Sequence, residues 1–463
     1  MLYPASDLVI DPLLIRQYDV SGPRYTSYPT ADRFVEAFGE PQLRQSLARR
    51  NIGGFSQPLS LYVHLPFCNT LCYYCGCNKI VTRDRARSAK YIKYLEKELA
   101  LLAPLLGERR ALREMHWGGG TPNFLAREEM AALVRAVEAQ LPREPRSQYS
   151  IEIDPRSAER GLMAFLADLG FDRVSLGVQD FDPAVQKAVH RVQSVELTQR
   201  VMEEARACGL RSINLDLIYG LPKQTLDSFN RTLDEVLRLG PERIALYSYA
   251  HLPALFKPQR RIDALALPSA EVKLELMTLA IGRLTRAGYL YIGMDHFARP
   301  GDELAAAQAR GQLSRSFQGY STQGGDLLGL GVSAIGQIGP AYYQNLKELA
   351  RYEEALDAGR LPVMRGVELS ADDLARRAVI QALMCHFRVS IESIELAYLV
   401  DFKAYFAEEL RALRPLADDG LVELGPDWVL VTPKGRLLVR PIAMVFDRYL
   451  RQACERAAYS KVI

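Results

Sequence analysis

Short runs rich in β-branched and aromatic residues alternate with longer amphipathic stretches from residue 61 onward. In one of these stretches, Leu162, Phe165, Leu166 and Leu169 keep the i, i+3, i+4, i+7 spacing of a helix with one buried face. A glycine follows this and two later stretches where a left-handed helix end is expected, at positions 170, 209 and 240. The short apolar runs predict strands at Leu61–Leu65, Glu114–Trp117, Tyr149–Ile153, Arg173–Val178, Ser212–Ile218 and Arg243–Tyr249.

Repeated strand-then-helix units with short links predict parallel strands joined by right-handed crossovers. The six units therefore predict an α/β fold, a partial (β/α)6 parallel barrel. We expect an N-terminal arm or lid over residues 1–55, the barrel with an extension over 56–365, and a mostly helical C-terminal domain over 366–463. Within that last domain, two helical stretches followed by two short β-rich runs are typical of a winged-helix module, which we interpret as a cap on the barrel.

Polar residues stand where each predicted strand ends. In parallel α/β barrels the carboxyl ends of the strands carry the chemistry, so these groups should meet at one rim. They are Cys68, Gly118–Pro122, Glu152 and Asp154, Gln179 and Asp180, Asp216, and Tyr249–His251.

Charge and hydropathy remove several classes of protein from consideration. The 58 basic and 55 acidic residues give a net charge of +3, which does not suggest a nucleic-acid-binding protein. Met1–Asp7 lacks the basic start and apolar core of a signal peptide. The uncharged run from Leu327 to Leu346 contains glycines, Pro340 and amide side chains, which argue against a membrane span. We therefore expect a cytoplasmic protein without membrane insertion.

Four of the seven cysteines fall within Leu61–Lys79, LYVHLPFCNTLCYYCGCNK. Zinc sites usually draw on two separated Cys or His pairs, and here the other three cysteines stand alone. A compact loop can instead wrap an iron–sulfur cluster. The C-x3-C-x2-C spacing of Cys68, Cys72 and Cys75 suits three irons of a [4Fe–4S] cluster, with one iron left open for a ligand.

This cysteine loop resembles the signature of the radical S-adenosylmethionine enzymes. Together with Arg24–Thr30 (RYTSYPT), the Cys75–Lys79 ending and Tyr459–Ile463, it resembles the family of oxygen-independent coproporphyrinogen III dehydrogenases, also called oxygen-independent coproporphyrinogen III oxidases. The resemblance covers nearly the whole chain. It implies the radical S-adenosylmethionine type of partial barrel and two S-adenosylmethionine molecules, one on the cluster and one beside it.

The resemblance also implies site residues. Contacts of the cluster-bound molecule are expected from Tyr62, Gly119, Glu152 and Ile335, and contacts of the second from Tyr74, Gly120, Thr121, Gln179, Arg191, Asp216 and Ala250. Tyr62 is also expected to take part in catalysis. For each of these residues alone, a purely structural role stays open. A glycine triplet is often only a tight turn, and strand-end carboxylates often cap helices or form ion pairs on the surface. Most arginines are surface residues.

Cys77 is not expected to be a cluster ligand, because a fourth thiolate would occupy the open iron. We interpret it as a catalytic or substrate-adjacent thiol, the alternative being a small buried residue in a crowded loop.

The resemblance implies a mechanism. A low-potential donor such as a flavodoxin or ferredoxin reduces the cluster, and cleavage of S-adenosylmethionine gives a 5′-deoxyadenosyl radical. The radical attacks the propionate β-carbons, so that coproporphyrinogen III becomes protoporphyrinogen IX in haem biosynthesis. Arg24, Arg299 and Lys79 are candidates for binding the substrate carboxylates, and a monomer is expected. Two rivals remain: a haem chaperone with the same barrel, and an electron-transfer iron–sulfur protein.

Overall fold

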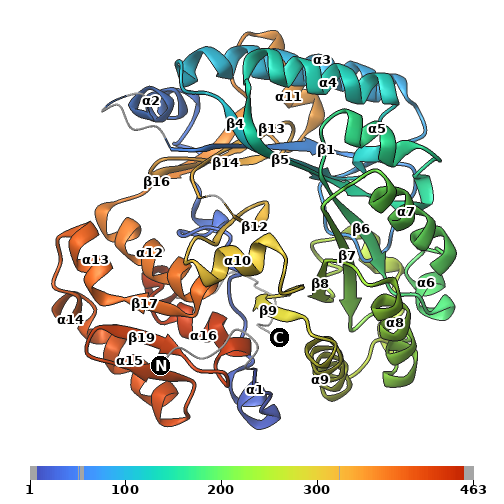
Figure 1. The fold of residues 1–463 in the computed structure, drawn as a ribbon. Coiled ribbons are helices and arrows are strands. Elements are labelled where there is room, and N and C mark those ends of the chain that lie inside the picture. The colour runs from blue at the N-terminus through green and yellow to red at the C-terminus, as the bar shows by residue number, and fades with distance from the viewer. Residues whose placement is uncertain (1–7, 51, 53–56, 323, 453–463) are drawn as a thin grey trace. The chain divides into compact units, whose positions relative to one another are not determined.

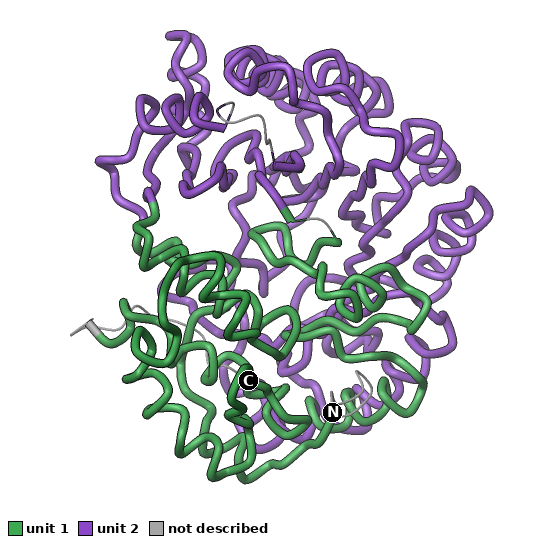
Figure 2. Tube along the Cα trace, turned by 60° about the vertical axis from the view of Figure 1, so that its left-hand side comes forward, with its two compact units in different colours: residues 1–33, 277–324, 369–463 green, residues 34–276, 325–368 purple. Residues whose placement is uncertain are grey.

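The computed structural model describes residues 8–50, 52, 57–322 and 324–452. The motif Tyr459–Ile463, Met1–Asp7 and Cys454 lie outside them. Contacts divide the chain into two compact units. Unit 1 comprises residues 1–33, 277–324 and 369–463, and unit 2 comprises residues 34–276 and 325–368 (Figure 2). The predicted boundaries at 55 and 365 stay a prediction.

Unit 2 contains the predicted parallel strands, all six at the expected places. They run in the order β1-β4-β5-β6-β7-β8, and each neighbouring pair is parallel. The structure extends most of them beyond the apolar run that predicted them: β1 Leu59–Leu65, β4 Leu112–Gly119, β5 Arg143–Ile153, β6 Arg173–Gln179, β7 Ser212–Tyr219 and β8 Arg243–Ser248. The predicted partial parallel barrel is therefore confirmed.

Helices of unit 2 cover the outer side of these strands (Figure 1). Helix α8 has a capping residue at each end. The Thr225 side chain caps its start, and Gly240 follows its end in the left-handed conformation at φ 61°. Gly170 and Gly209 also have positive φ, as predicted. The helices are α2 Glu40–Arg50, α3 Ala86–Leu102, α4 Arg127–Gln140, α5 Leu162–Asp168, α6 Pro183–Ala188, α7 Val195–Ala207, α8 Leu226–Leu239 and α11 Leu349–Asp357.

The glycine-rich segment after residue 325 forms strands rather than loops. β13 Asp326–Leu330 pairs in parallel with β1, on the side away from β4. It is followed by antiparallel strands, β14 Ile335–Ile338, β15 Ala341–Asn345 and β16 Val363–Glu368. Its glycines allow close packing of neighbours: a Cβ on Gly329 would lie 2.7 Å from the Ile335 carbonyl oxygen.

A buried carboxylate joins this extension to α3. Glu98 is 1% exposed and accepts hydrogen bonds from Tyr352 Oη (2.5 Å), Asn345 Nδ2 (2.6 Å) and the Gly331 amide (2.8 Å). Burial raises the pKa of Glu98 to about 7, although these donors oppose the shift. The Glu98 carboxyl group thus stabilises the turn after β13, and the free energy of burying this group depends on whether it is ionised.

We expect Glu98→Gln to change how stability depends on pH. Because the folded-state pKa is raised, the folded chain binds this proton more tightly than the unfolded chain between pH 4.5 and about 7. In the wild type this group makes the free energy of unfolding fall as pH rises through that window, by up to about 1.4 kcal/mol per pH unit. Denaturant titrations of both proteins from pH 4 to 8 measure the difference, and equal slopes would contradict the prediction.

Unit 1 combines the described arm, a small central piece and the C-terminal region. The arm contacts the C-terminal region: Tyr25 Oη donates to Asp447 (2.9 Å) and Arg440 Nε donates to the Pro23 carbonyl (2.9 Å). Tyr25 and Tyr28 are buried. Within unit 1, the described part of the arm therefore packs against the C-terminal region. Its first helix is α1 Pro12–Tyr18.

The C-terminal region has the winged-helix-like order that the sequence predicts. Helices α12 Ala371–His386, α13 Ile391–Tyr398, α14 Phe402–Tyr405 and α15 Ala407–Asp418 accompany a sheet in the order β17-β19-β18. The strands are β17 Arg388–Ser390, β18 Val422–Leu424 and β19 Trp428–Val431, and α16 Val439–Met444 and α17 Arg448–Gln452 follow.

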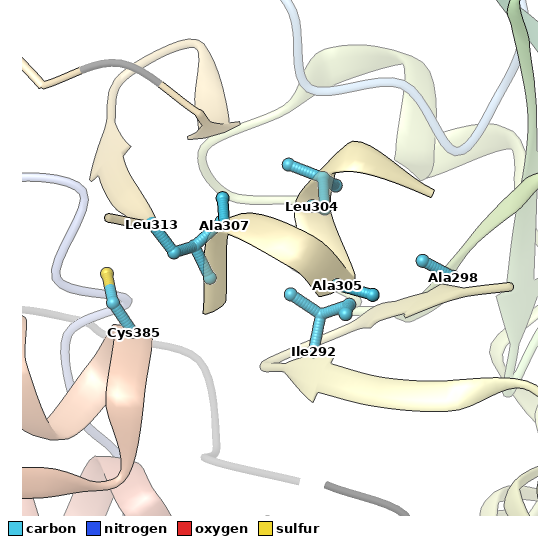
Figure 3. Close-up of a cluster of buried hydrophobic side chains, with 7 residues drawn as sticks. All are labelled: Ile292, Ala298, Leu304, Ala305, Ala307, Leu313 and Cys385. Atoms are coloured by element: carbon cyan, nitrogen blue, oxygen red, sulfur yellow. The ribbon is translucent and has the colours of Figure 1, made fainter. Parts of the chain in front are cut away.

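The central piece of unit 1 holds a second buried cluster. It is built from the hairpin β9 Leu290–Gly293 and β10 His296–Ala298, from α10 Glu303–Ala309, and from the hairpin β11 Ser314–Ser316 and β12 Gly319–Ser321. Ile292, Leu304, Leu313 and Cys385 pack together there (Figure 3). α9 Ala270–Arg286 links the two units in sequence. Among the described residues, no helix is both long enough and apolar enough to cross a membrane.

Candidate active site

The cysteine loop is closed at its base by a short parallel pairing. β2 Phe67–Cys68 pairs with β3 Ile80–Val81, so the chain returns to its starting point. Inside the loop, Lys79 Nζ donates to the Cys75 carbonyl (3.0 Å). Lys79 is one of the cations predicted to bind the substrate carboxylates, and here it stabilises the loop. Cys68 and Cys72 are buried, Cys75 is half-buried, and Cys77 is exposed; all four are free thiols.

Polar donors face the first two sulfur atoms. Thr121 Oγ1 donates to Cys68 Sγ (3.5 Å), and Cys72 Sγ accepts from Arg156 Nη2 (3.5 Å) and Arg191 Nη1 (3.6 Å). Guanidinium groups stabilise a thiolate over a thiol.

No group of three or more His, Cys, Asp or Glu side chains in the described part of the chain is arranged around a single metal ion. A cluster places different demands, because each thiolate binds its own iron.

Cys75 and Cys77 share a proton. The Cys77 thiol hydrogen-bonds to Cys75, which lowers the pKa of Cys75 to about 6 and raises that of Cys77. Cys75 is therefore the thiolate of the pair near neutral pH, as a metal ligand must be.

The glycine triplet forms a tight cradle beside this loop. The Gly120 amide donates to the Leu65 carbonyl (2.8 Å), and the Thr121 amide donates to the Phe67 carbonyl (2.8 Å). A Cβ on Gly120 would lie 2.6 Å from the Pro66 carbonyl carbon, and one on Gly119 would lie 2.6 Å from His64. Gly119 also has φ 115°, which side chains rarely adopt. The triplet is more than a simple turn, because it lets two backbone segments meet.

Register across the sheet explains how Glu152 is held. Tyr62, His116 and Ser150 pair side by side on β1, β4 and β5, and the rings of Tyr62 and His116 stack at 5.9 Å. His116 Nε2 lies 3.4 Å from Glu152 Oε1, and the Gly119 amide donates to Glu152 Oε2 (3.2 Å). Desolvation would raise the pKa of Glu152, but these partners bring it below its usual value. Glu152 is thus an ionised acceptor at the rim.

Arg191 is buried and reaches across two strand ends. It donates to the Gly177 carbonyl (2.6 Å) and to Asp154 Oδ2 (3.2 Å), while its Nε has no hydrogen-bond partner. Burial would lower the pKa of Arg191, but nearby Tyr74, Asp154 and Cys72 favour its charged form and raise the pKa. This arginine is therefore a rim residue, as the sequence predicts, and it has one donor left for a ligand.

Asp216 lies opposite Gly177 on β7. Desolvation, and then the charge of Glu152, raise the pKa of Asp216 to about 7, against hydrogen bonds from Ser175 (3.1 Å) and Asn214 (2.7 Å). The two predicted carboxylates at the rim therefore differ in ionisation near neutral pH.

The remaining predicted residues follow the same edge. Gln179 ends β6 with φ 70° and lies near Arg191 around Gly177. Buried Gln259 donates to the carbonyls of Tyr74 (3.0 Å) and Ala250 (3.1 Å), which holds these two segments together. Ile335 begins β14, separated from β1 by β13.

The sequence reasoning assigned no role to His64, His116, Arg156 or Gln259. Strand alternation was a usable signal for both histidines: His64 follows Tyr62 by two residues, and His116 stands on a predicted strand before the glycines. Nothing local marks Gln259, because its partners are 185 and 9 residues away.

Comparisons with known proteins agree with this geometry. The model of the radical SAM superfamily matches residues 62–236, and that of the HemN C-terminal domain matches residues 369–438. Oxygen-independent coproporphyrinogen III oxidase of Pseudomonas aeruginosa is 51% identical, covering 97% of this chain and 98% of its own length. The Escherichia coli protein of the same name is 48% identical, with 98% of each chain covered. The structure of coproporphyrinogen III oxidase (HemN) from Escherichia coli, described as a radical SAM enzyme, matches with a TM-score of 0.91 at 47% identity, covering 96% of this chain and all of that one.

The parallel barrel and the cysteine loop at its rim thus define a radical S-adenosylmethionine enzyme. A [4Fe–4S] cluster and S-adenosylmethionine are the cofactors of that class, as predicted. Nearly full-length identity narrows the class, and the chain belongs to the family of oxygen-independent coproporphyrinogen III oxidases. The family resemblance stated from the sequence is therefore confirmed.

Proposed function

We propose that the chain catalyses the oxygen-independent oxidative decarboxylation of two propionate side chains of coproporphyrinogen III to vinyl groups, giving protoporphyrinogen IX for haem biosynthesis. The observation that carries the proposal is the three-thiol loop, with donors aimed at two of its sulfur atoms, beside a glycine cradle. The naming of the near-full-length relatives supports it. Each propionate loses a hydrogen atom to the 5′-deoxyadenosyl radical, one electron to an external electron acceptor, and CO2, so the enzyme acts as a dehydrogenase.

The residues present fit both cofactors. Cys68, Cys72 and Cys75 would hold three irons, and the donors from Thr121, Arg156 and Arg191 suit anionic sulfur. A Cβ at any of the three glycines would meet neighbouring atoms within 2.8 Å. The cradle therefore tolerates no side chain, and its backbone groups stay accessible to a ligand. The unpartnered Nε of buried Arg191 is free for a ligand carboxylate.

When bound and reduced, the cluster with S-adenosylmethionine supplies the 5′-deoxyadenosyl radical that removes hydrogen from a propionate β-carbon. The chain's residues position the reactants. Ionised Glu152, held by His116 and Gly119, would accept hydrogen bonds from the ammonium group of the cluster-bound molecule, and Tyr62, Gly119 and Ile335 would contact that molecule.

The second S-adenosylmethionine is assigned to a place beside the first, as the family resemblance implies. Arg191 binds its carboxylate, and Asp216 accepts from its polar hydrogens with Ser175 and Asn214 fixing its orientation. The other contacts are Tyr74, Gly120, Thr121, Gln179 and Ala250. Cys77, exposed and protonated through its bond to Cys75, is the thiol available to the substrate.

Several further features belong to the proposal. An external low-potential donor, such as a flavodoxin or ferredoxin, supplies the electron. The enzyme works as a cytoplasmic monomer, without nucleic acid.

An anaerobic assay of the reconstituted protein with reductant, S-adenosylmethionine and coproporphyrinogen III tests the reaction. Chromatography and mass spectrometry should detect 5′-deoxyadenosine and protoporphyrinogen IX together. Absence of both, with an intact cluster that responds to S-adenosylmethionine, would reject the proposal and favour the haem chaperone, which stoichiometric haem binding would identify. A cluster insensitive to S-adenosylmethionine would favour the electron-transfer protein.

Arg156→Met should lower the reduction potential of the cluster. Hydrogen bonds to ligand sulfur stabilise the reduced, more negative state, and the variant loses the bond from Arg156 Nη2 to Cys72 Sγ. We expect a shift of roughly tens of millivolts to more negative potential, measured by an anaerobic redox titration followed by electron paramagnetic resonance. Arg135→Met, which removes an exposed arginine on α4, is the control. Equal potentials in all three proteins would show that this bond does not tune the cluster.

A further inference from the structure

Arg365 ends a row of paired residues that crosses the antiparallel extension of unit 2. Ile335 of β14 pairs with Gln344 of β15, and Gln344 pairs with Arg365 of β16. Directly paired residues of neighbouring strands point to the same face of a sheet. Figure 1 shows β14 and β16 on this side of the sheet, next to β13. Because neighbouring strands lie about 4.8 Å apart, the backbone of Arg365 lies roughly 10 Å from that of Ile335.

The face that carries Arg365 also carries two of the predicted cofactor contacts. Ser60 of β1 pairs with Leu327 of β13, and Leu327 pairs with Gln337 of β14. Tyr62 follows Ser60 by two residues, and side chains two apart on a strand share a face. Ile335 is related to Gln337 in the same way. Tyr62, Ile335 and Arg365 therefore point to one side of the sheet.

Arg365 uses only part of its guanidinium group in these contacts. The side chain is half-buried, its Nε donates to Gln344 Oε1 (2.9 Å), and its guanidinium carbon lies 5.8 Å from the centre of the Phe34 ring. Among the described residues, no hydrogen bond or ion pair involves its two terminal nitrogens. The acidic residue of the same strand, Glu368, pairs with Arg49 instead. Arg365 is therefore held in place while its terminal N–H groups stay available.

Lys347 places a second cation close to Arg365. It follows β15 and is exposed. Desolvation of part of the side chain, and then the charge of Arg365, lower the pKa of Lys347, so the two charges are close enough to repel each other. Within the described ranges no carboxylate, the adjacent Glu348 included, forms an ion pair with Lys347.

A hydrogen bond connects this second cation to the cysteine loop. Asn78 Nδ2 donates to the Lys347 carbonyl (3.1 Å). Asn78 follows Cys77, the exposed thiol that we propose is available to the substrate. The backbone that carries Lys347 therefore lies beside the part of the cysteine loop that is open to a ligand.

We propose that Lys347 and Arg365 bind a carboxylate of the substrate, on a propionate other than the one that reacts. The inference rests on the proposed function, since coproporphyrinogen III carries one propionate on each of its four pyrrole rings. Two neighbouring cations without a counter-charge repel each other, and a carboxylate relieves this repulsion and accepts from the terminal donors of Arg365. Arg365 lies two strands beyond Ile335, so the bound carboxylate is separated from the cofactor, as a group on another ring requires.

The cations predicted from the sequence are different ones. Lys79 donates to the Cys75 carbonyl inside the cysteine loop. Arg24, which pairs with Asp295, and Arg299 belong to unit 1 and stay predictions. Sequence alone did not identify Arg365, because three strands separate β16 from β1, and only their register brings it to the face of Tyr62.

Binding of coproporphyrin III, which has the same four carboxylates, tests the inference without requiring turnover. Anaerobic fluorescence titrations of the full-length, reconstituted protein compare the wild type with Lys347→Met and Arg365→Met. Lys93→Met and Arg135→Met are matched controls, since each removes an exposed cation from a helix of unit 2. We expect each site variant to bind about tenfold more weakly, because it loses a charge-assisted interaction, and both controls to bind normally. Equal affinity of the wild type and both site variants would overturn the inference.

Two further ligands identify the group that is bound. Protoporphyrin IX keeps only the two propionates that the proposed reaction leaves in place, and we expect the same loss of affinity in the site variants with this ligand. Equal affinity of all proteins for protoporphyrin IX would overturn the assignment to a propionate that does not react. The affinity for S-adenosylmethionine should not change, and a parallel loss would overturn the inference by assigning the two cations to the cofactor.

Thermal unfolding without porphyrin separates binding from a structural role. Removing one of two cations that repel each other should leave the melting temperature of Lys347→Met unchanged or raise it. A melting temperature several degrees lower would overturn the inference by showing a structural role. If Arg365→Met unfolds at a lower temperature because it loses its bond to Gln344, the porphyrin affinity of Lys347→Met decides. Because these readouts use no reductant and no turnover, their failure is distinguishable from failure of the catalytic assay.

Discussion

Replacing Cys68 with alanine is expected to abolish product formation, by at least about a thousandfold or ~4 kcal/mol of transition-state stabilisation. The chain would keep only Cys72 and Cys75 of the three proposed ligands, and Thr121 Oγ1 would lose its sulfur acceptor. Iron content and the absorbance of the cluster should fall together with 5′-deoxyadenosine formation. Anaerobic reconstitution followed by iron analysis and the product assay measures all three.

Cys208→Ala is the matched control for this loss. Cys208 is a half-buried, free cysteine that follows α7, far in sequence from the cysteine loop. The control should retain full iron and full activity. A Cys68→Ala protein with wild-type iron content and turnover would contradict the assignment of Cys68 as a ligand.

Replacing Gly120 with alanine is expected to disable the cradle while the fold survives. Its Cβ would lie 2.6 Å from the Pro66 carbonyl carbon and 2.8 Å from the Phe67 carbonyl oxygen, both backbone atoms that cannot rotate away. Relief requires moving the strand that leads into Cys68. Overpacking of this kind costs about 1–3 kcal/mol of the free energy of unfolding. We also expect the affinity for S-adenosylmethionine to fall at least about tenfold, because a shift of 1.4 kcal/mol at the site suffices.

Gly301→Ala is the control, since a Cβ at Gly301 meets no atom within 4 Å and its φ is not in the left-handed region. Denaturant unfolding and calorimetric titration with S-adenosylmethionine compare the two variants with the wild type. Equal binding by Gly120→Ala would show that the close approach of the two backbone segments has no role in the cofactor site.

The parallel sheet was predictable because its signal is local. Each strand contains a short run of β-branched and aromatic residues, and in β5 and β6 buried positions alternate with less buried ones, so no partner is needed to identify the strand. Strands β13 to β16 were missed for the same reason: their glycines and polar residues at 329, 336, 337 and 344 imitate turns. These residues form strands because neighbouring segments pack against them, as Tyr343 packs against Gly336. Tertiary contacts outweigh local propensity there.

The candidate site was predictable wherever a motif marks it. The cysteines, the glycine triplet and the strand-end carboxylates all lie at the rim where the topology places them. The residues that hold them were not predictable in the same way. Arg156 donates to Cys72 Sγ from 84 residues away, and the charge balance around Asp216 depends on Glu152, which is two strands distant. Such interactions require the register of the sheet, which no single segment specifies.

The central claim is that the chain removes a hydrogen atom from the propionate β-carbon of coproporphyrinogen III. The most direct measurement supplies substrate deuterated at the β-carbons and determines the isotope content of 5′-deoxyadenosine by mass spectrometry. We predict that deuterium appears in 5′-deoxyadenosine while protoporphyrinogen IX accumulates. Formation of 5′-deoxyadenosine without deuterium, while the vinyl groups still form, would contradict the account.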